Sequence, residues 1–157
     1  MSADVGRLRE ELYEWCGNDK VCRRAADYYI AVLKNPCYPP AVRRSKYYEK
    51  IVEKYGPPPR CDVKELVLER LRGTVLEKYA GEIAELAELI RRRLHTRSRT
   101  AAAVATAIVA ERRGYVVVYK YVAARFGVAD NVLRMWLLRA RKLYADVTAV
   151  SDAGGGR

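Results

Sequence analysis

The stretch "YKYVAARFGVADNVLRMW", from Tyr119 to Trp136, has the pattern of two helices joined by a tight turn. Gly127 stands at the turn, and Ala123 is small where the two helices would cross. Apolar residues fall at the positions that such a unit buries, namely Val122, Phe126, Val128, Leu133 and Trp136. The stretch therefore predicts a helix-turn-helix, which either contacts DNA bases or packs as a helical hairpin against other elements.

Helical periodicity continues over the rest of the chain and predicts an all-α fold. The expected helices cover residues 4–16, 20–33, 40–56, 63–73, 74–94, 98–114, 115–127 and 130–144. Asp19 and Asp62 are suited to cap two of them, and Pro40 suits the first turn of a third. "YVVVY" (115–119) is ambiguous, because its β-branched residues could also form a short strand.

Prolines divide the chain into parts of different character. Residues 1–61 contain short helices interrupted by proline and cysteine, whereas residues 62–145 contain longer helices with few breakers. We expect a proline-broken helical N-terminal arm at 1–61, a C-terminal helical bundle at 62–145 and an irregular tail at 146–157.

Four cysteines stand in the first part, and their spacing argues against a zinc site. No pair has the short C-x2–4-C spacing of a zinc knuckle. The sequence has no glutamine, three asparagines and 31% charged residues, a composition typical of hyperthermophiles, in which intracellular disulfides occur. We expect two disulfides, Cys16–Cys22 and Cys37–Cys61, because each pair brackets one local helical unit; buried free thiols are the alternative.

Positive charge is concentrated in two regions and predicts a polyanionic partner. The chain has 30 Lys and Arg against 19 Asp and Glu, a net charge of +11. Residues 20–61 contain 10 basic and 3 acidic residues with interleaved tyrosines, and residues 91–110 contain 5 arginines and no acid. The expected nucleic-acid contacts are Lys20, Arg23, Arg24, Lys34, Arg43, Arg44, Lys46, Tyr47, Lys50, Arg91, Arg92, Arg93, Arg97 and Arg99.

No catalytic or cofactor motif is evident. His95 is the single histidine, it lies among arginines, and no phosphate-binding glycine loop, nucleophile elbow or metal motif occurs. We therefore expect a non-enzymatic protein with no catalytic residue, metal, cofactor or small-molecule substrate. The longest apolar run, residues 100–110, is too short to span a bilayer, and membrane contact is left open.

The second helix of the opening stretch is poorly equipped to read bases. Its groove-facing positions would include Asp130, Met135 and Leu138, and only Asn131 and Arg134 suit base contacts. The segments "YVVVYKYVAARF" and "VLRMWLL" are apolar on nearly every side, which is typical of helices buried in a core or a subunit contact. The expected oligomer interface consists of Val117, Tyr121, Met135, Trp136 and Leu138.

Two family resemblances follow from these residues. "SRTAAAVATAIVAERRG" (98–114) and "YVAARFGVADNVLR" (121–134) resemble the Ala-rich helix and the closing helix pair of an archaeal transcription factor B cyclin-type repeat. The basic helical arm followed by an apolar bundle resembles the major coat proteins of filamentous and rod-shaped viruses of hyperthermophilic archaea, and so do "SRTAAAVATAIVAERRG" and the aromatic-glycine helix link "YKYVAARFGVADNVL" (119–133). That second resemblance implies small all-helical subunits that associate with each other and wrap double-stranded DNA in a virion.

The expected function is therefore structural: a coat or nucleocapsid subunit that packages double-stranded DNA in a helical assembly by sequence-independent phosphate neutralisation. Its partners would be DNA and either itself or a paralogous subunit, and its location the virion. The alternative is a helix-turn-helix transcription regulator in the cytoplasm or nucleoid of an archaeal cell. An RNA-binding subunit or an interaction scaffold is a third possibility.

Overall fold

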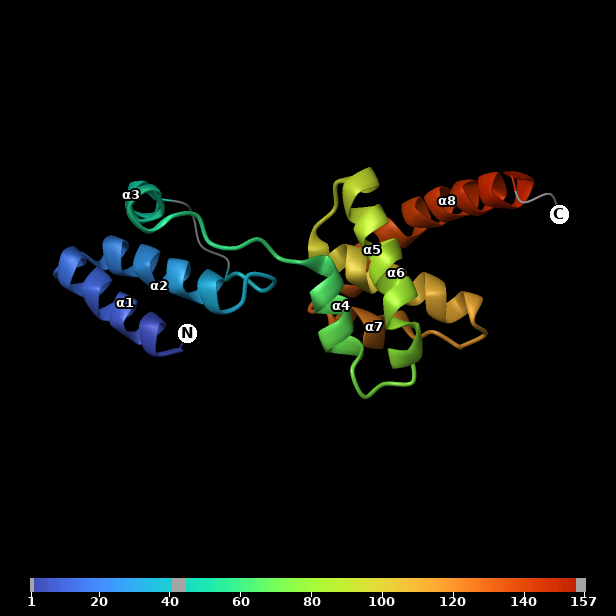
Figure 1. Ribbon diagram of the computed structural model, residues 1–157, viewed down its shortest axis with the longest axis horizontal. Helices are drawn as coiled ribbons and strands as arrows, with labels where there is room; N and C mark the ends of the chain where they lie inside the picture. The colour runs from blue at the N-terminus through green and yellow to red at the C-terminus, as the bar shows by residue number, and fades with distance from the viewer. Residues whose placement is uncertain (1, 41–44, 155–157) are drawn as a thin grey trace. The chain divides into compact units, whose positions relative to one another are not determined.

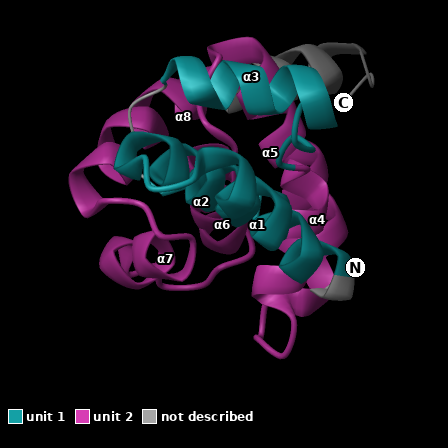
Figure 2. Cartoon of the chain, turned by 90° about the vertical axis from the view of Figure 1, so that its left-hand side faces the viewer, with its two compact units in different colours: residues 1–61 teal, residues 62–157 magenta. Residues whose placement is uncertain are grey.

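The described part of the chain is all-α, as the periodicity predicts: its regular secondary structure consists of helices. A computed structural model describes residues 2–40 and 45–154, with side chains described for 4–40 and 45–143, and no strand occurs in these ranges. Contacts divide the chain into two compact units, residues 1–61 (unit 1) and 62–157 (unit 2), drawn in separate colours in Figure 2. Each unit has its own buried residues and is described by itself.

Unit 1 contains α1 (Ser2–Cys16), α2 (Lys20–Lys34) and α3 (Lys46–Tyr55). Its core is a small cluster in which Leu12, Tyr29 and Ile51 bring the three helices together. The Asp19 carboxylate accepts the backbone N–H groups of Val21 and Cys22, so α2 begins where the sequence predicts.

The helix expected from Pro40 begins later than predicted. The Ser45 side chain accepts the backbone N–H of Tyr48 and caps α3, whose first residue is Lys46. A hydroxyl cap fixes the start of the helix more firmly than the backbone angle of a proline does. Its end at Gly56 is as predicted, with φ of 88°.

Both expected disulfides are present. Cys16–Cys22 joins the end of α1 to the first turn of α2, and Cys37–Cys61 joins the segment after α2 to the last residue of unit 1. The pairing is the expected one. Only the Cys37–Cys61 bridge encloses a helix, α3, whereas the Cys16–Cys22 bridge closes the short link between α1 and α2.

Unit 2 is built around α6 (Ser98–Arg112). Every residue from Thr100 to Ala110 is buried, and α6 contacts α4 (Val63–Leu71), α5 (Ala80–Leu94), α7 (Tyr119–Arg125) and α8 (Asp130–Gly154), as Figure 1 shows. The many alanines allow neighbouring helices to approach α6 from several sides. The longest apolar run of the sequence is thus the central helix of a bundle.

Hydrogen bonds between distant elements hold the outer helices to α6. Glu111, near the end of α6, accepts from Tyr119 of α7 and pairs with Arg141 of α8 at 2.8 Å. Arg113, just after α6, pairs with Glu82 of α5 at 2.6 Å. The Glu111 contacts fix α7 and α8 relative to the central helix, and the Arg113–Glu82 pair fixes α5.

The single long helix expected over residues 74–94 is wrong in its first part. Gly73 with φ of 77° ends α4, and the Thr74 hydroxyl then donates to the carbonyl of Leu71 at 2.7 Å. A short 3₁₀ turn, η1 (Glu77–Tyr79), follows before α5 starts at Ala80. This local turn competes with helix formation because a threonine hydroxyl can satisfy a backbone carbonyl.

The helix expected from residue 115 is also wrong in its first part. Gly114 with φ of 87° ends the preceding turn, residues 115–118 are neither helix nor strand, and α7 starts at Tyr119. Three consecutive β-branched valines disfavour a helical start. Val116 is 95% exposed, so this stretch is not the buried apolar helix that its composition predicts.

The tail expected to be irregular is largely helical. α8 runs from Asp130 through Gly154, which contradicts the boundary predicted at 146, and in Figure 1 its second half extends beyond the other helices of unit 2. No proline or glycine interrupts residues 145–153, and each added residue of an existing helix gains one hydrogen bond.

Candidate nucleic-acid interface

The opening stretch forms two helices joined by a tight turn. α7 ends at Arg125, and the Val128 N–H donates to the carbonyl of Ala123 at 2.9 Å, which closes the turn. Gly127 has φ of 65°, a backbone geometry that a side chain disfavours. Phe126 and Leu133 on either side are fully buried, and the first turns of α8 are thereby fixed against α6.

The exposed face of α8 offers few groups for reading bases. Asn131 and Arg134 are exposed, but the Arg134 guanidinium pairs with Asp130 at 3.2 Å and lies over the Tyr119 ring at 5.7 Å. Met135 is 46% exposed and Leu138 70%. Asn131 therefore remains as a polar side chain at the start of this face that no described residue engages, and Met135 and Leu138 make the exposed surface beyond it apolar.

The arginine cluster at the end of α5 is partly engaged. Arg91 binds Glu88 at 2.8 Å, and this hydrogen bond holds the pKa of Glu88 below its ordinary value. Arg92 lies 3.7 Å from the same carboxylate. Arg93 is exposed, and no described residue pairs with it. The cluster therefore presents less charge than its composition suggests.

Arg97 and Arg99 lie beside the turn between α7 and α8, although about thirty residues separate them from it in sequence. The Arg99 guanidinium donates to the carbonyl of Gly127 at 3.0 Å. Arg97 is exposed at the start of α6, and no described residue pairs with it. The structure thus brings the predicted arginines of the α5–α6 link next to the first turn of α8.

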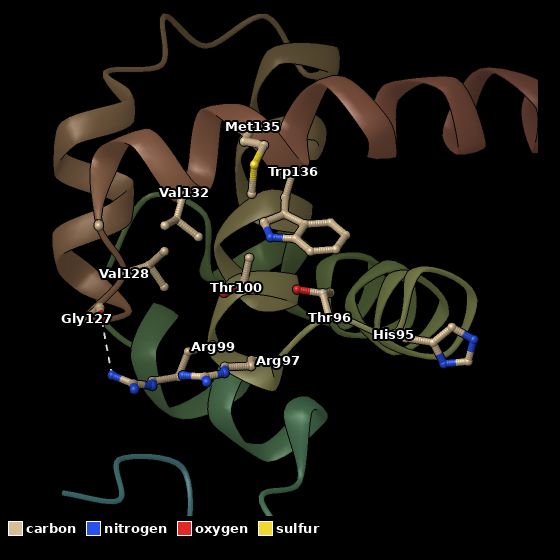
Figure 3. Close-up of a pocket in the computed structure, with 11 residues that line it drawn as sticks. His95, Thr96, Arg97, Arg99, Thr100, Gly127, Val128, Val132, Met135 and Trp136 are labelled. Carbon is tan, nitrogen blue, oxygen red and sulfur yellow. Dashed lines mark hydrogen bonds between the residues drawn. The ribbon is translucent and has the colours of Figure 1, made fainter. Parts of the chain in front are cut away.

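A pocket of about 460 Å³ opens between these segments (Figure 3). One side comes from the α5–α6 link and the start of α6, and the other from the α7–α8 turn and α8. Its lining residues are His95, Thr96, Arg97, Arg99, Thr100, Gly127, Val128, Ala129, Val132, Met135 and Trp136. Sequence reasoning missed this pocket, because only the packing of α6 under both links brings them together.

The predicted cations of unit 1 divide into free and engaged groups. Lys20, Arg24 and Lys34 are exposed along α2, and Lys50 is exposed on α3. Lys46 is exposed too, but its ammonium lies over the Tyr47 ring, 5.4 Å from the ring centre. Arg23 is engaged, since its Nε donates to the carbonyl of Gly17 at 2.6 Å and its guanidinium lies over the Tyr13 ring. Arg43 and Arg44 lie outside the described residues.

Tyr47 has a structural partner. Its hydroxyl donates to the Asp19 carboxylate at 2.6 Å and links α3 to the cap of α2. This bond lowers the pKa of Asp19 and raises the pKa of Tyr47. The hydroxyl proposed to donate to phosphate is therefore committed within unit 1.

The residues proposed for an oligomer interface differ in exposure. Tyr121 is 71% exposed on α7, and Leu138 and Met135 are exposed on α8. Val117 is half-buried, and half-buried Trp136 is covered in part by Arg139, whose guanidinium lies 4.8 Å from the ring centre. Exposed Val116 and Val118 before α7 were not anticipated, because that segment was expected to be helical.

Among the described residues, no group of three or more His, Cys, Asp and Glu side chains is arranged to hold a metal ion. All four cysteines are in disulfides. Over the same ranges, no helix combines the length and apolar character needed to cross a membrane.

Comparison with known proteins found no match: no family model, no curated protein and no solved structure matches the chain. The function is therefore inferred from the geometry described above.

Proposed function

We propose that this protein binds double-stranded DNA without catalysis, and that it does so chiefly by neutralising backbone phosphates rather than by reading bases. The observation that carries the proposal is a contrast within unit 2, between cations that have no described partner and an exposed helix face that is largely apolar. Cations without a described partner, Arg93 and Arg97, stand in the same unit as a helix face that exposes Met135 and Leu138. Phosphate contacts need only such cations, whereas base reading needs free donors and acceptors.

The cations of unit 1 add to this charge. Lys20, Arg24 and Lys34 lie on the exposed side of α2, and a helix rises about 1.5 Å per residue, so they extend over roughly 21 Å. A protein with cations on both units and a net charge of +11 suits DNA packaging. The form we favour is a packaging subunit of a virion or filament, with Tyr121, Met135 and Leu138 in contact with further subunits.

The salt dependence of binding tests the proposal directly. Fluorescence anisotropy of a labelled duplex at increasing NaCl should give a steep line, with a slope of about −0.9 for each phosphate neutralised. Replacing Arg93 and Arg97 together by Gln should reduce that slope by about 1.8, equally for unrelated DNA sequences.

A matched control removes the same net charge from cations that already have partners. Lys64 pairs with Glu85 at 2.9 Å and Arg113 with Glu82 at 2.6 Å. The double variant Lys64→Gln/Arg113→Gln should leave the slope nearly unchanged. Equal effects of the two double variants would refute a local phosphate-binding surface. Electron microscopy of the protein with linear duplex DNA should show coated filaments.

A transcription regulator is the second candidate, and the α7–turn–α8 geometry with its exposed Asn131 favours it. This function predicts that Asn131→Ala and Arg134→Ala weaken binding to one preferred sequence by about tenfold each while leaving non-specific binding intact. Binding that is equal for all duplexes, in the native protein and in these variants, argues for packaging instead.

A further inference from the structure

The pocket between the α5–α6 link and α8 has two chemically different ends. An apolar wall on α8 consists of Val132, Met135 and Trp136, and the opposite end of the pocket contains Arg97 and Arg99 (Figure 3). Thr100 lies between these two ends. Its volume of about 460 Å³ falls in the range of pockets that hold small organic molecules, roughly 300–1,000 Å³. No carboxylate is among the described side chains that line it.

The cationic end has one guanidinium committed and one available. Arg99 donates to the carbonyl of Gly127 and holds the start of α6 against the α7–α8 turn. Arg97, at the same end, has no partner among the described residues. An unpaired guanidinium beside a partly enclosed apolar space favours a ligand that supplies a negative charge, because such an ion pair is screened less than one on an open surface.

The apolar end is held in a defined shape. The Arg139 guanidinium lies over the Trp136 ring, 4.8 Å from the ring centre, and Arg139 is not part of the pocket lining. On the inner side of α8, Leu133 and Leu137 are buried. Val132 and Trp136 are half-buried. A rigid aromatic wall contributes apolar contact area at a small cost in side-chain entropy.

We propose that this pocket is a binding site for a small amphipathic organic anion: an aromatic or alkyl body against Val132 and Trp136, and one carboxylate, sulfonate or phosphate group against Arg97. The site shares Met135 with the exposed face of α8 and Arg97 with the cations proposed to contact phosphates. The proposal does not depend on DNA binding, because its test uses small probes in the absence of DNA.

Trp136 allows a direct test, because the chain has two tryptophans and the other, Trp15, lies in unit 1. In full-length W15F protein, titration with the aromatic sulfonate 1-anilinonaphthalene-8-sulfonate should quench Trp136 saturably and produce sensitised probe emission with one site per chain. The neutral analogue N-phenyl-1-naphthylamine should bind at least tenfold more weakly.

Three variants in the W15F background separate charge from shape. Arg97→Gln should weaken the anionic probe about tenfold and leave the neutral probe unchanged, whereas Val132→Phe should fill the pocket and weaken both. Arg72→Gln, which removes an exposed arginine outside the pocket lining, should change neither. Unfolding midpoints reported by Trp136 should agree among variants and so establish that each is folded.

Several results would overturn the proposal: absence of saturable binding, equal affinity for the anionic and neutral probes, or equal effects of Arg97→Gln and Arg72→Gln. Probe binding that survives Val132→Phe in a folded protein would place the probe elsewhere and would also overturn it.

Discussion

Removing the disulfide Cys37–Cys61 should destabilise unit 1 and leave unit 2 unchanged. The bridge joins residues 24 apart, and the segment between them contains α3, which supplies Ile51 to the unit 1 core. The chain-entropy relation for a loop of this length gives about 3.5 kcal/mol at 25 °C, against about 2 kcal/mol for the 6-residue separation of Cys16–Cys22. Both cysteines of the longer loop are half-buried, so alanine replacement adds only a small packing cost.

The two tryptophans make the effect measurable unit by unit. Trp15 packs edge-on against Tyr47 at 6.3 Å in unit 1, and Trp136 lies in unit 2. Urea unfolding of Cys37→Ala/Cys61→Ala should therefore be followed by Trp15 fluorescence in a W136F background and by Trp136 fluorescence in a W15F background. The Trp15 transition should lose about 3.5 kcal/mol of unfolding free energy, more than the loss in Cys16→Ala/Cys22→Ala.

Two results would contradict this expectation. A loss below about 1 kcal/mol would mean that the open chain keeps α3 close to α2 without the bridge. An equal loss in the Trp136 transition would mean that the two units unfold together, in contrast to their separate cores.

Three further predictions follow from individual contacts. Gly127→Ala should lower the unfolding free energy of the Trp136 transition by roughly 1–2 kcal/mol, because φ of 65° is strained for alanine. As a control, Gly81→Ala lies in α5 with open space around the added methyl and should raise that free energy by about 0.5–1 kcal/mol. Glu111→Gln should weaken the attachment of α7 and α8 to α6 and lower the unfolding free energy by about 1 kcal/mol or less, because the pair of Glu111 with Arg141 is partly exposed. A double-mutant cycle with Arg141→Gln that gives no coupling energy would contradict this prediction. Tyr47→Phe should raise the pKa of Asp19 toward its ordinary value near 3.8, because the Tyr47 hydroxyl is the main cause of its depression. In the native protein, the lowered pKa of Asp19 contributes stability that is present above pH 3.8 and is lost as the pH falls through the lower, folded pKa. Carboxyl NMR titration should therefore show the Asp19 midpoint at a higher pH in Tyr47→Phe than in the native protein. An unchanged midpoint would refute the assignment.

Local interactions account for what the sequence predicted correctly. The caps at Asp19 and Asp62, the stop at Gly56 and the turn at Gly127 each depend on atoms within about four residues, so residue type and spacing suffice to find them. The predicted disulfide pairs are also present, although only Cys37–Cys61 encloses a helix, and Cys16–Cys22 closes the short link between α1 and α2.

The errors at helix boundaries also have local causes, but causes that composition conceals. Thr74 satisfies a carbonyl that a continuing helix would otherwise use, and the valines at 116–118 follow a glycine that has already ended a helix. At the other end, residues 145–153 look too varied for a helix, yet they continue one that α6 and α7 have already ordered at its start.

Residue pattern and spacing predicted a helical, basic chain, with two disulfides favoured over free thiols and two helices joined at Gly127. Which charges are available, and where they lie, depends on the tertiary structure. Tyr47 is engaged by Asp19, which lies 28 residues away, whereas Arg97 has no partner among the described residues and lies beside a turn about thirty residues away. The physical reason is that a contact between distant segments, or a pocket wall, depends on which surfaces the folded helices bring together. Sequence spacing anticipates only pairs within one helix, such as Asp130 and Arg134 four residues apart.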